Sequence, residues 1–461
     1  MNKLVFIFTF CWAYVFFAKA QETAPTNKDV DFIIQKIKTV YAGYDSTIYL
    51  KPFKNAIKEI TAQPTTDTLS AYSKLTALFN DQHLALYELR LTKNIDLTAC
   101  STNITYLKKA AAAPPQKNSH EGYWINDINT QVIFLKYEGR DEYSGYLIES
   151  DKDIPAGYKI IKLYKNFNAQ RNVDYTDPVR QFRTITKAYF KNSTTFFIRP
   201  FSKWYKIKNY NSGYLGSKKP FIEKPSIIAL DSNNVLVKMH DFSSRGVARI
   251  YDSLITANKD ILANCKNLII DIRNNAGGTI NNFFSLLPFF GDTPIVTVGA
   301  FKLCSQDLIE DALADKKFYA SRNDTSKIND LNSAVKRMEA NKGHFIYLKP
   351  DTIIFKKETS KIKNVALVIN HGCRSAAELM VLYLKQQAIV KTFGESTGGA
   401  VDYLDLLTYR LPVTNYIFWV GTTKREITTQ QPKFDNNGIK PDVQINENTE
   451  DWIQVIKNYY E

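Results

Sequence analysis

One stretch of the C-terminal half, NVALVINHGCRSAAELMVLYL, constrains the fold of this chain more than any other. It begins with a short β-branched apolar run from Val365 to Ile369, which is typical of a buried strand. A polar turn follows, and from Ser375 onward the apolar residues recur at helical spacing. The stretch therefore predicts a strand, a tight turn and a helix in direct succession, with Ser375 at the helix N-terminus.

Two interpretations of Ser375 remain open on this stretch alone. Residues 375–378, Ser-Ala-Ala-Glu, match a capping box, in which a serine at the cap is followed three residues later by a glutamate. A helix N-terminus also offers free N–H groups and a positive dipole end, which favour negative charge developing on a serine nucleophile. Other motifs of the chain have to decide between a structural cap and a nucleophile.

The size of the chain predicts several domains rather than one. A chain of 461 residues is expected to hold roughly two or three. Its hydrophobic content of 44% and aromatic content of 13% can fill sizeable cores. Charged residues of both signs are mixed along most of the sequence, which argues for globular domains and against long disorder.

The first twenty residues are typical of a secretory signal peptide. Lys3 provides the positive charge, residues 4–17 the apolar run, and residues 18–20 an A-x-A cleavage site. The run is short for a membrane anchor and ends in small residues. No later segment looks long and apolar enough to span a bilayer. We expect an exported chain, periplasmic or extracellular, that begins at Gln21.

Charge and cysteine usage narrow the possible partners. The formal net charge is +14, or +12 without the two lysines of the leader. Basic residues are spread out and form no aromatic-interleaved motif, so acidic surfaces or substrates are expected rather than nucleic acid. The wide cysteine spacing argues against a zinc ribbon or redox pair, although export would permit disulfides. The cysteines after the leader are Cys100, Cys265, Cys304 and Cys373.

The N-terminal half changes character along its length. Residues 29–80 have helical periodicity, and Asp81-Gln82-His83 then leads into a strand-like run at 84–91. The sequence AAAAPP at 110–115 resembles a linker. Residues 120–225 contain short strand-like runs such as QVIFLKY, GYLIES, YKIIKLY and TTFFIRP, which predict a mostly β region.

From Ser226 onward strands and helices alternate, as in an α/β layer. The buried strand NLIIDI at 267–272 runs into a turn, Arg273 to Gly278, and a helix is expected from Ile280. Such a strand, Gly-Gly turn and helix can aim backbone N–H groups at an anion, although a plain tight turn has the same sequence pattern. A last helix, capped by Thr449, is expected to close the chain.

Four motifs in order resemble those of the tail-specific, or carboxyl-terminal processing, serine peptidases. They are IIDIRNNAGG, VALVINHGCRSAAEL, FGESTGG and DNNGIKPDV. The resemblance covers about Val235 to Ile445, with a weaker match at residues 81–83. It implies an α/β fold with a ClpP/crotonase-like peptidase core, an N-terminal helical segment and a mostly β middle domain. The expected divisions are a signal peptide (1–20), an N-terminal helical part of the peptidase (21–112), a β-rich middle domain in the PDZ position (113–225) and a serine peptidase core (226–461).

The resemblance assigns catalytic roles to two residues at the start of the helix and to the glycine turn. Ser375 falls on the family's nucleophile, and the N–H of Ala376 falls on one oxyanion donor. The turn of Gly277 and Gly278 falls on the other donor, and either glycine could supply it. A tetrahedral oxyanion would then form beside a helix N-terminus and a glycine-rich turn.

The activating base departs from the Ser-Lys type of this family. Those enzymes carry a lysine in a T-x-G-K-G loop, whereas residues 397–400 read Thr-Gly-Gly-Ala, with Ala400 at the lysine position. Lys391 lies only at the strand-like entry to the loop. The tricorn-protease branch instead uses a histidine before the inserted domain and a carboxylate near a C-terminal G-x-x-P-D element. His83 and Asp435 match those two positions, Asp435 standing where tricorn has a glutamate.

Competing assignments remain for these roles. The sequence around Asp435, DNNG, is also ordinary turn chemistry. His240, at a strand end in the core, is the alternative base, whereas His371 on the tight turn is expected to be structural. Cys373 precedes the helix start and its N–H donors, so it is not expected to be the nucleophile. The middle domain lacks a clear PDZ carboxylate-binding loop, for which Gly157 is a poor substitute.

The leader and the resemblance together predict an exported serine endopeptidase or carboxyl-terminal processing peptidase that cleaves peptide or unfolded protein substrates through an acyl-enzyme on Ser375. No metal or organic cofactor and no nucleic acid is expected. Loss of the dyad lysine keeps open an alternative, a catalytically inactive homologue that binds peptides. A crotonase-type acyl-CoA enzyme on a similar core is disfavoured, because export would separate it from its CoA substrates.

Overall fold

The computed structural model describes most of the chain beyond the leader. The described residues are 27–62, 67–79, 81–89, 95–112, 120–165, 171–178, 181–199, 202–217, 224–243, 245–291, 293–429, 432–435, 437–446, 449 and 451–461. The expected signal peptide at 1–20 and the proline end of the expected linker lie outside these residues. No helix within them is long and apolar enough to cross a membrane.

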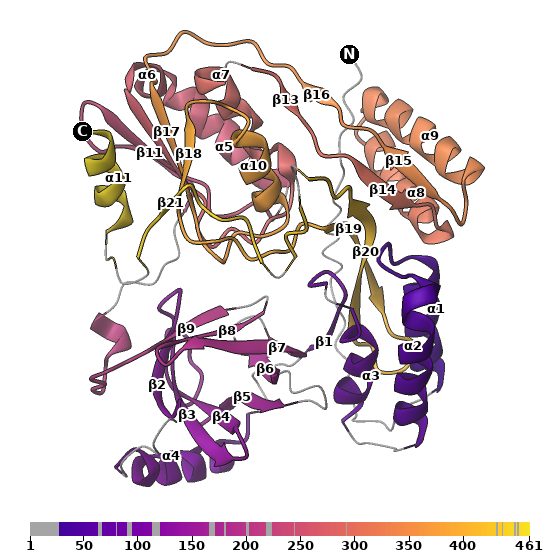
Figure 1. Ribbon diagram of the computed structural model, residues 1–461, viewed down its shortest axis with the longest axis vertical. Helices are drawn as coiled ribbons and strands as arrows, with labels where there is room; N and C mark the ends of the chain where they lie inside the picture. The colour runs from indigo at the N-terminus through magenta and orange to yellow at the C-terminus, as the bar shows by residue number, and fades with distance from the viewer. Residues whose placement is uncertain are drawn as a thin grey trace.

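A six-stranded sheet forms the centre of the C-terminal part, in the order β10-β11-β12-β17-β18-β21 (Figure 1). β10 is antiparallel to β11, and the remaining neighbours are parallel. This arrangement confirms the α/β layer that alternating strands and helices predict. The strands are β10 (Ser226–Ala229), β11 (Asn234–Lys238), β12 (Asn267–Asp271), β17 (Asn364–Ile369), β18 (Val390–Gly394) and β21 (Val443–Gln444).

Both faces of this sheet are covered, because successive side chains of a strand point to opposite sides. In β12, Leu268 and Ile270 join the core under α5, η3, α7 and α10, whereas Ile269 packs on the other face with Trp452 and Ile456 of α11. The helices are α5 (Arg245–Ala257), α6 (Lys259–Asn264), α7 (Leu287–Phe290), α10 (Ala376–Leu384), α11 (Trp452–Tyr460) and the 3₁₀ helix η3 (Ile280–Leu286).

The N-terminal helices pack against segments from the distant C-terminal half (Figure 1). Ile33, Tyr72 and Leu86 share one apolar cluster with Leu308 and Phe418. The elements involved are α1 (Asn27–Thr39), α2 (Ser46–Ala62), α3 (Thr68–Thr76), β1 (Ala85–Leu89), β14 (Ala300–Leu303), α8 (Gln306–Ala320), α9 (Thr325–Ala340), β15 (Phe345–Leu348), β19 (Tyr403–Arg410) and β20 (Ile417–Arg425). A separate pair of short strands is β13 (Ile295–Val296) and β16 (Thr352–Ile353).

The middle of the chain forms a closed ring of antiparallel strands, β2 to β9. Each strand pairs with the next, and β9 also pairs with β2, so that every strand of the ring has two neighbours. Trp124, Phe196 and Trp204 lie fully buried inside its apolar cluster. The strands are β2 (Gly122–Asn126), β3 (Gln131–Gly139), β4 (Glu142–Ser150), β5 (Lys159–Lys165), β6 (Arg171–Asp177), β7 (Phe182–Asn192), β8 (Thr195–Ile198) and β9 (Ser202–Lys206).

One helix packs outside this ring. Leu107 of α4 (Leu97–Ala112) lies in a small cluster with Phe134 and Tyr146 of the ring, and the short η2 (Leu215–Ser217) follows β9. Gly157 has φ +85, and a Cβ there would lie 2.1 Å from the carbonyl oxygen of Cys100 in α4. Gly157 therefore serves close packing between α4 and the ring.

Strand β1 joins the ring to the rest of the molecule. Its first residues pair with β20, Ala85 opposite Trp419, and its last residues pair with the start of β7, Leu89 opposite Phe182. The pairings therefore run without interruption from β15 through β14, β20 and β1 into the ring.

Two local predictions differ in detail from the structure. The helix expected from Ile280 begins as a 3₁₀ segment and becomes α-helical only at Leu287. Asp451, rather than Thr449, caps the last helix, because its carboxylate accepts a hydrogen bond from Gln454 N (2.9 Å). The four cysteines of the described residues are all buried and free.

Candidate active site

Ser375 occupies a backbone conformation that L-amino acids rarely adopt. It lies between β17 and α10 with φ 53° and ψ −119°. Such a conformation is strained and persists only when its surroundings hold it. The glutamate of the predicted capping box contributes, because Glu378 Oε2 accepts a hydrogen bond from Ser375 N (3.1 Å). In a sharp strand-to-helix turn of this kind, the serine side chain projects from the tip of the turn, where a substrate can reach its hydroxyl.

The glycine turn lies directly against Ser375. β12 and β17 are parallel neighbours, so the loops that follow them meet at the same edge of the sheet. A Cβ on Gly277 would lie 2.8 Å from Ser375 Cβ and 2.9 Å from Ala376 N. Only glycine fits at this position, where φ is also +90°.

Two of the backbone N–H groups at this point have no hydrogen-bond partner among the described residues. Gly277 N donates to Asn275 Oδ1 (2.9 Å), so its N–H is already engaged. The contacts of the described residues give no acceptor for Gly278 N or for Ala376 N at the start of α10. Gly278 and Ala376 are therefore the two available donors for an oxyanion.

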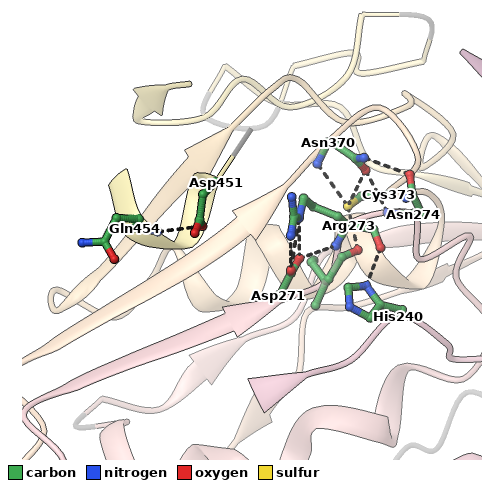
Figure 2. A network of polar contacts seen from close by, with 9 residues as sticks. His240, Asp271, Arg273, Asn274, Asn370, Cys373, Asp451 and Gln454 are labelled. Atoms are coloured by element: carbon green, nitrogen blue, oxygen red, sulfur yellow. Dashed lines mark hydrogen bonds and ion pairs between the residues drawn. The ribbon is translucent and has the colours of Figure 1, made fainter. Parts of the chain in front are cut away.

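A network beneath the two turns fixes them to each other (Figure 2). Asn370 Nδ2 donates to Asn274 Oδ1 (2.8 Å), and Asn274 N donates back to Asn370 Oδ1 (2.8 Å). The thiol of Cys373 donates to Ile272 O (3.0 Å), and burial raises its pKa to about 12. Cys373 is therefore held as a buried thiol, which is unsuited to nucleophilic attack.

The loop at 397–400 is bound to the Ser375 turn through one buried carboxylate. Glu378 accepts hydrogen bonds from Thr397 Oγ1 (2.6 Å), Gly399 N (2.9 Å) and Ala400 N (2.7 Å). Burial raises the pKa of Glu378, although these donors oppose the shift. Ala400 is buried where Ser-Lys enzymes would have their base, and Lys391 instead donates to Tyr459 OH (2.8 Å) on α11.

His83 approaches this loop from the other side. Its neighbour Gln82 donates from Nε2 to Gly398 O (3.0 Å) and Gly399 O (2.8 Å), which docks residues 81–83 on the loop that flanks Ser375. His83 is buried, and among the described residues its Nδ1 has no hydrogen-bond partner. Burial lowers the pKa of His83 to about 4, so the imidazole is neutral at neutral pH.

Asp81 is the carboxylate that contacts this histidine. Asp81 Oδ1 accepts a hydrogen bond from His83 N (2.7 Å) and lies 3.7 Å from His83 Nδ1. Burial, with a smaller contribution from Asp402, raises the pKa of Asp81 to about 7. Asp81 has no expected role from the sequence patterns above, although its Asp-x-His spacing with His83 is a signal that could have suggested one.

Asp435 lies in the same carboxylate cluster but apart from His83. Its Oδ1 accepts hydrogen bonds from Val401 N (3.0 Å) and Asp402 N (2.9 Å). Burial, Asp81 and Asp402 together raise the pKa of Asp435 well above its usual range. The described residues include no hydrogen bond or ion pair between Asp435 and His83. Its role as the supporting acid stays a prediction.

The other histidines considered are engaged elsewhere. His240 Nδ1 lies 2.7 Å from Arg273 O, within the network of Figure 2. His371 lies between two carboxylates, with Nε2 2.9 Å from Asp127 Oδ2 and Nδ1 3.7 Å from Glu395 Oε2. Within the described part of the chain, no group of three His, Cys, Asp or Glu residues could hold a metal ion.

A comparison with solved structures finds several peptidases among the similar chains. Mature CPAF is 13% identical with a TM-score of 0.47, over 90% of this chain and 91% of that one. The photosystem II D1 C-terminal processing protease is 11% identical with a TM-score of 0.40, over 92% and 94%. The tricorn protease is 10% identical with a TM-score of 0.36, over 91% of this chain and 34% of its own. These likenesses are too distant to assign an activity, and no curated protein matches the chain.

The core sheet, the strained serine and the glycine turn together have the form of a serine hydrolase site. Residues 234–445, which contain Ser375, Gly277, Gly278 and Asp435, match the model of peptidase family S41. Over this segment the chain matches peptidase family S41, and this match supports a serine-type peptidase.

Proposed function

We propose that this chain is an exported serine endopeptidase that cleaves peptides or unfolded proteins through an acyl-enzyme on Ser375. The observation that carries the proposal is the strained backbone of Ser375, at φ 53°, packed against Gly277. A cap alone needs no such conformation, because N-cap residues have ordinary extended dihedrals. The strain supports a nucleophile held between two free N–H groups.

The residues present supply each step of acyl transfer. Ser375 Oγ attacks the scissile carbonyl and gives its proton to His83, which then protonates the leaving amine. Gly278 N and Ala376 N stabilise the oxyanion of each tetrahedral intermediate. Asp81 accepts a hydrogen bond from His83 N and so fixes the backbone that carries the proposed base, and Asp435 holds the backbone of the flanking loop. Water then attacks the acyl-enzyme by the reverse proton transfers.

The leader sequence supports the proposed export, and the ring supports the proposed cleavage at internal bonds. The leader, with Lys3, an apolar run and a small-residue site at 18–20, supports export. Cleavage at internal bonds is supported by the closed ring. Capture of a free C-terminus by strand addition needs an open sheet edge, and no strand from β2 to β9 offers one.

Covalent labelling tests the proposed nucleophile. The mature chain, whose first residue should read as Gln21, is incubated with a fluorophosphonate probe and with an unfolded polypeptide. We expect labelling of Ser375 and internal cleavage of the polypeptide, and loss of both in Ser375→Ala, since no other activated hydroxyl is proposed. Labelling is read by intact mass and by the mass of the peptide that contains residue 375.

The outcome separates the two candidate functions. A folded wild-type protein that binds the polypeptide but takes up no probe would overturn the enzyme and favour the peptide-binding homologue. Two observations give that candidate its basis, namely Ala400 at the lysine position and the unpartnered Nδ1 of His83.

The pH profile tests His83 as the base. Because burial lowers the pKa of His83 to about 4, its neutral form persists above that pH and is lost as the pH falls through it. We expect the acidic limb of kcat/KM to have its midpoint near pH 4, well below the ordinary range of a histidine. Initial rates of cleavage of a peptide substrate, measured from roughly pH 3 to pH 8, give the midpoint of this acidic limb.

A matched pair of variants accompanies this profile. His83→Ala should lower kcat/KM by about 100-fold or more, whereas His240→Ala should retain activity if it folds. Activity of His83→Ala equal to that of the wild type, or a loss confined to His240→Ala, would reject the assignment.

A further inference from the structure

Two contacts between the ring of strands β2–β9 and the rest of the described chain lie close in sequence to residues of the proposed site. The first is β1, which pairs with β7 of the ring and begins two residues after His83. The second is a group of ionisable side chains with little exposed surface that we call the junction cluster. It consists of Asp127 and Lys203 from the ring and of His371 and Glu395 from the core.

The members of the junction cluster lie within ion-pair distance of one another. Lys203 has a side chain with no exposed surface, and its Nζ lies 2.7 Å from Glu395 Oε1. His371 lies between the other two members, with Nε2 2.9 Å from Asp127 Oδ2 and Nδ1 3.7 Å from Glu395 Oε2. Phe197 of β8 packs its ring edge-on against His371, and Lys203 Nζ lies 5.5 Å from the centroid of the same ring.

Backbone hydrogen bonds hold the cluster residues in place, one within the ring and one within the core. Asp127 N donates to Lys203 O (2.8 Å), so the two ring residues are fixed to one another. In the core, Glu395 N donates to Ile369 O (3.0 Å) at the end of β17. Burial alone would raise the pKa of Glu395, but the nearby side chains of His371 and Lys203 outweigh it and lower the pKa to about 2. Glu395 is therefore charged at neutral pH and depends on its partners.

The two core members start the two loops that surround Ser375. His371 opens the turn that ends at Ser375, and Glu395 opens the loop whose residues 397–400 bind Glu378. These loops touch directly, since a Cβ on Gly398 would lie 2.7 Å from His371 O. A shift of His371 or Glu395 would thus be passed to the strained residue, which stays in place only while its surroundings hold it.

We propose that the junction cluster positions the Ser375 turn, so that Lys203 and Asp127 of the ring are positioning residues for the peptidase reaction. This inference rests on the proposed function, in which Ser375 is the nucleophile. It makes docking of the ring against the core a condition for turnover. Removing Lys203 would leave Glu395 buried with an uncompensated charge, and the loop it opens would move to bring that charge to water.

The test replaces Lys203 with Met, which keeps the length of the side chain and removes its charge. We expect Lys203→Met to lower kcat for a peptide substrate by about 100-fold, the effect of a small misplacement of reacting groups, with KM changed less than about threefold. The probe-labelling rate of Ser375 should fall in parallel. Lys203→Arg, which keeps the charge, and the double variant Lys203→Met/Glu395→Gln, which removes both charges, should each recover about tenfold or more.

A second measurement reads the position of the turn without using activity. Amide hydrogen exchange of the peptides that cover residues 370–378 should be faster in Lys203→Met than in the wild type. The matched control is Lys165→Met, which breaks an ion pair with Asp141 on the same ring where both side chains are partly exposed. The control should match the wild type in labelling rate and in exchange.

Three outcomes decide the matter. Unchanged exchange at 370–378 and unchanged kcat in a folded Lys203→Met protein would overturn the positioning role. Equal losses in Lys203→Met and Lys165→Met would do the same, because general destabilisation of the ring would then explain them. A wild-type protein that takes up no probe would refute the proposed function instead, and the exchange result would still decide whether the cluster positions the turn.

Discussion

Gly277→Ala is expected to reduce the rate of Ser375 labelling and peptide cleavage by about 100- to 1,000-fold, the effect of losing an oxyanion donor. The added Cβ would lie 2.6 Å from Arg374 O, 2.8 Å from Ser375 Cβ and 2.9 Å from Ala376 N. All three atoms belong to the turn that carries the nucleophile, so the turn and the glycine segment have to move apart. Separation of Gly278 N from Ala376 N would then dismantle the oxyanion site. Single-turnover labelling with the fluorophosphonate measures the loss.

Gly139→Ala is the matched control for this substitution. Gly139 has φ +93°, close to the +90° of Gly277, but a Cβ there would meet nothing within 4 Å. The control carries the same backbone strain without the clash, so it should label at the wild-type rate. Equal rates for Gly277→Ala and the wild type would show that the close contact with Ser375 has no part in catalysis.

Arg425→Met is expected to cost about 3–5 kcal/mol of the free energy of unfolding, because it leaves a buried carboxylate without its counter-charge. Arg425 and Asp402 are almost fully buried, and Arg425 Nη2 lies 2.5 Å from Asp402 Oδ1. Asp402 also accepts hydrogen bonds from Phe434 N (3.0 Å) and Asp435 N (2.9 Å). Urea unfolding followed by tryptophan fluorescence measures the change as a lower midpoint at unchanged slope.

A surface ion pair provides the comparison for Arg425. Lys259 and Glu358 are 3.1 Å apart with about half of each side chain exposed, at 53% and 43%. Lys259→Met should cost no more than about 1 kcal/mol, since exposed pairs contribute little. The double variant Arg425→Met/Asp402→Asn should be more stable than Arg425→Met alone. A single variant as stable as Lys259→Met would contradict the buried-pair explanation.

The local part of the fold could be predicted because its causes are local. The apolar run before Ser375 and the helical spacing after it are sequence patterns, and the strand β17 and helix α10 follow them closely. The prediction of the N-cap of the last helix was wrong, because two residues with suitable side chains lie close together there. Thr449 and Asp451 are both good caps, and only the hydrogen bond to Gln454 N distinguishes them.

The closed ring could not be predicted, because its closure joins β2 to β9 across the intervening strands. Alternating patterns identified strands in this region, but the pattern of a strand does not specify its partner. The same applies to the candidate site. Asp81 contacts His83 locally, but Glu378 binds a loop some twenty residues later, and burial decides the pKa of each. The burial of these side chains results from tertiary packing and cannot be read from the sequence.

The position of β1 sets the order in which this enzyme can be assembled. Its residues lie early in the chain, but its partner β20 lies near the end, with Leu86 opposite Phe418. Pairing over so long a separation closes a large loop, which is a slow step in folding. The strand after His83 has no partner on this side unless residues 417–419 of β20 are present. The segment that bears the proposed base thus needs the C-terminal part of the chain for its pairing, whereas the strands of the ring all lie within residues 122–206.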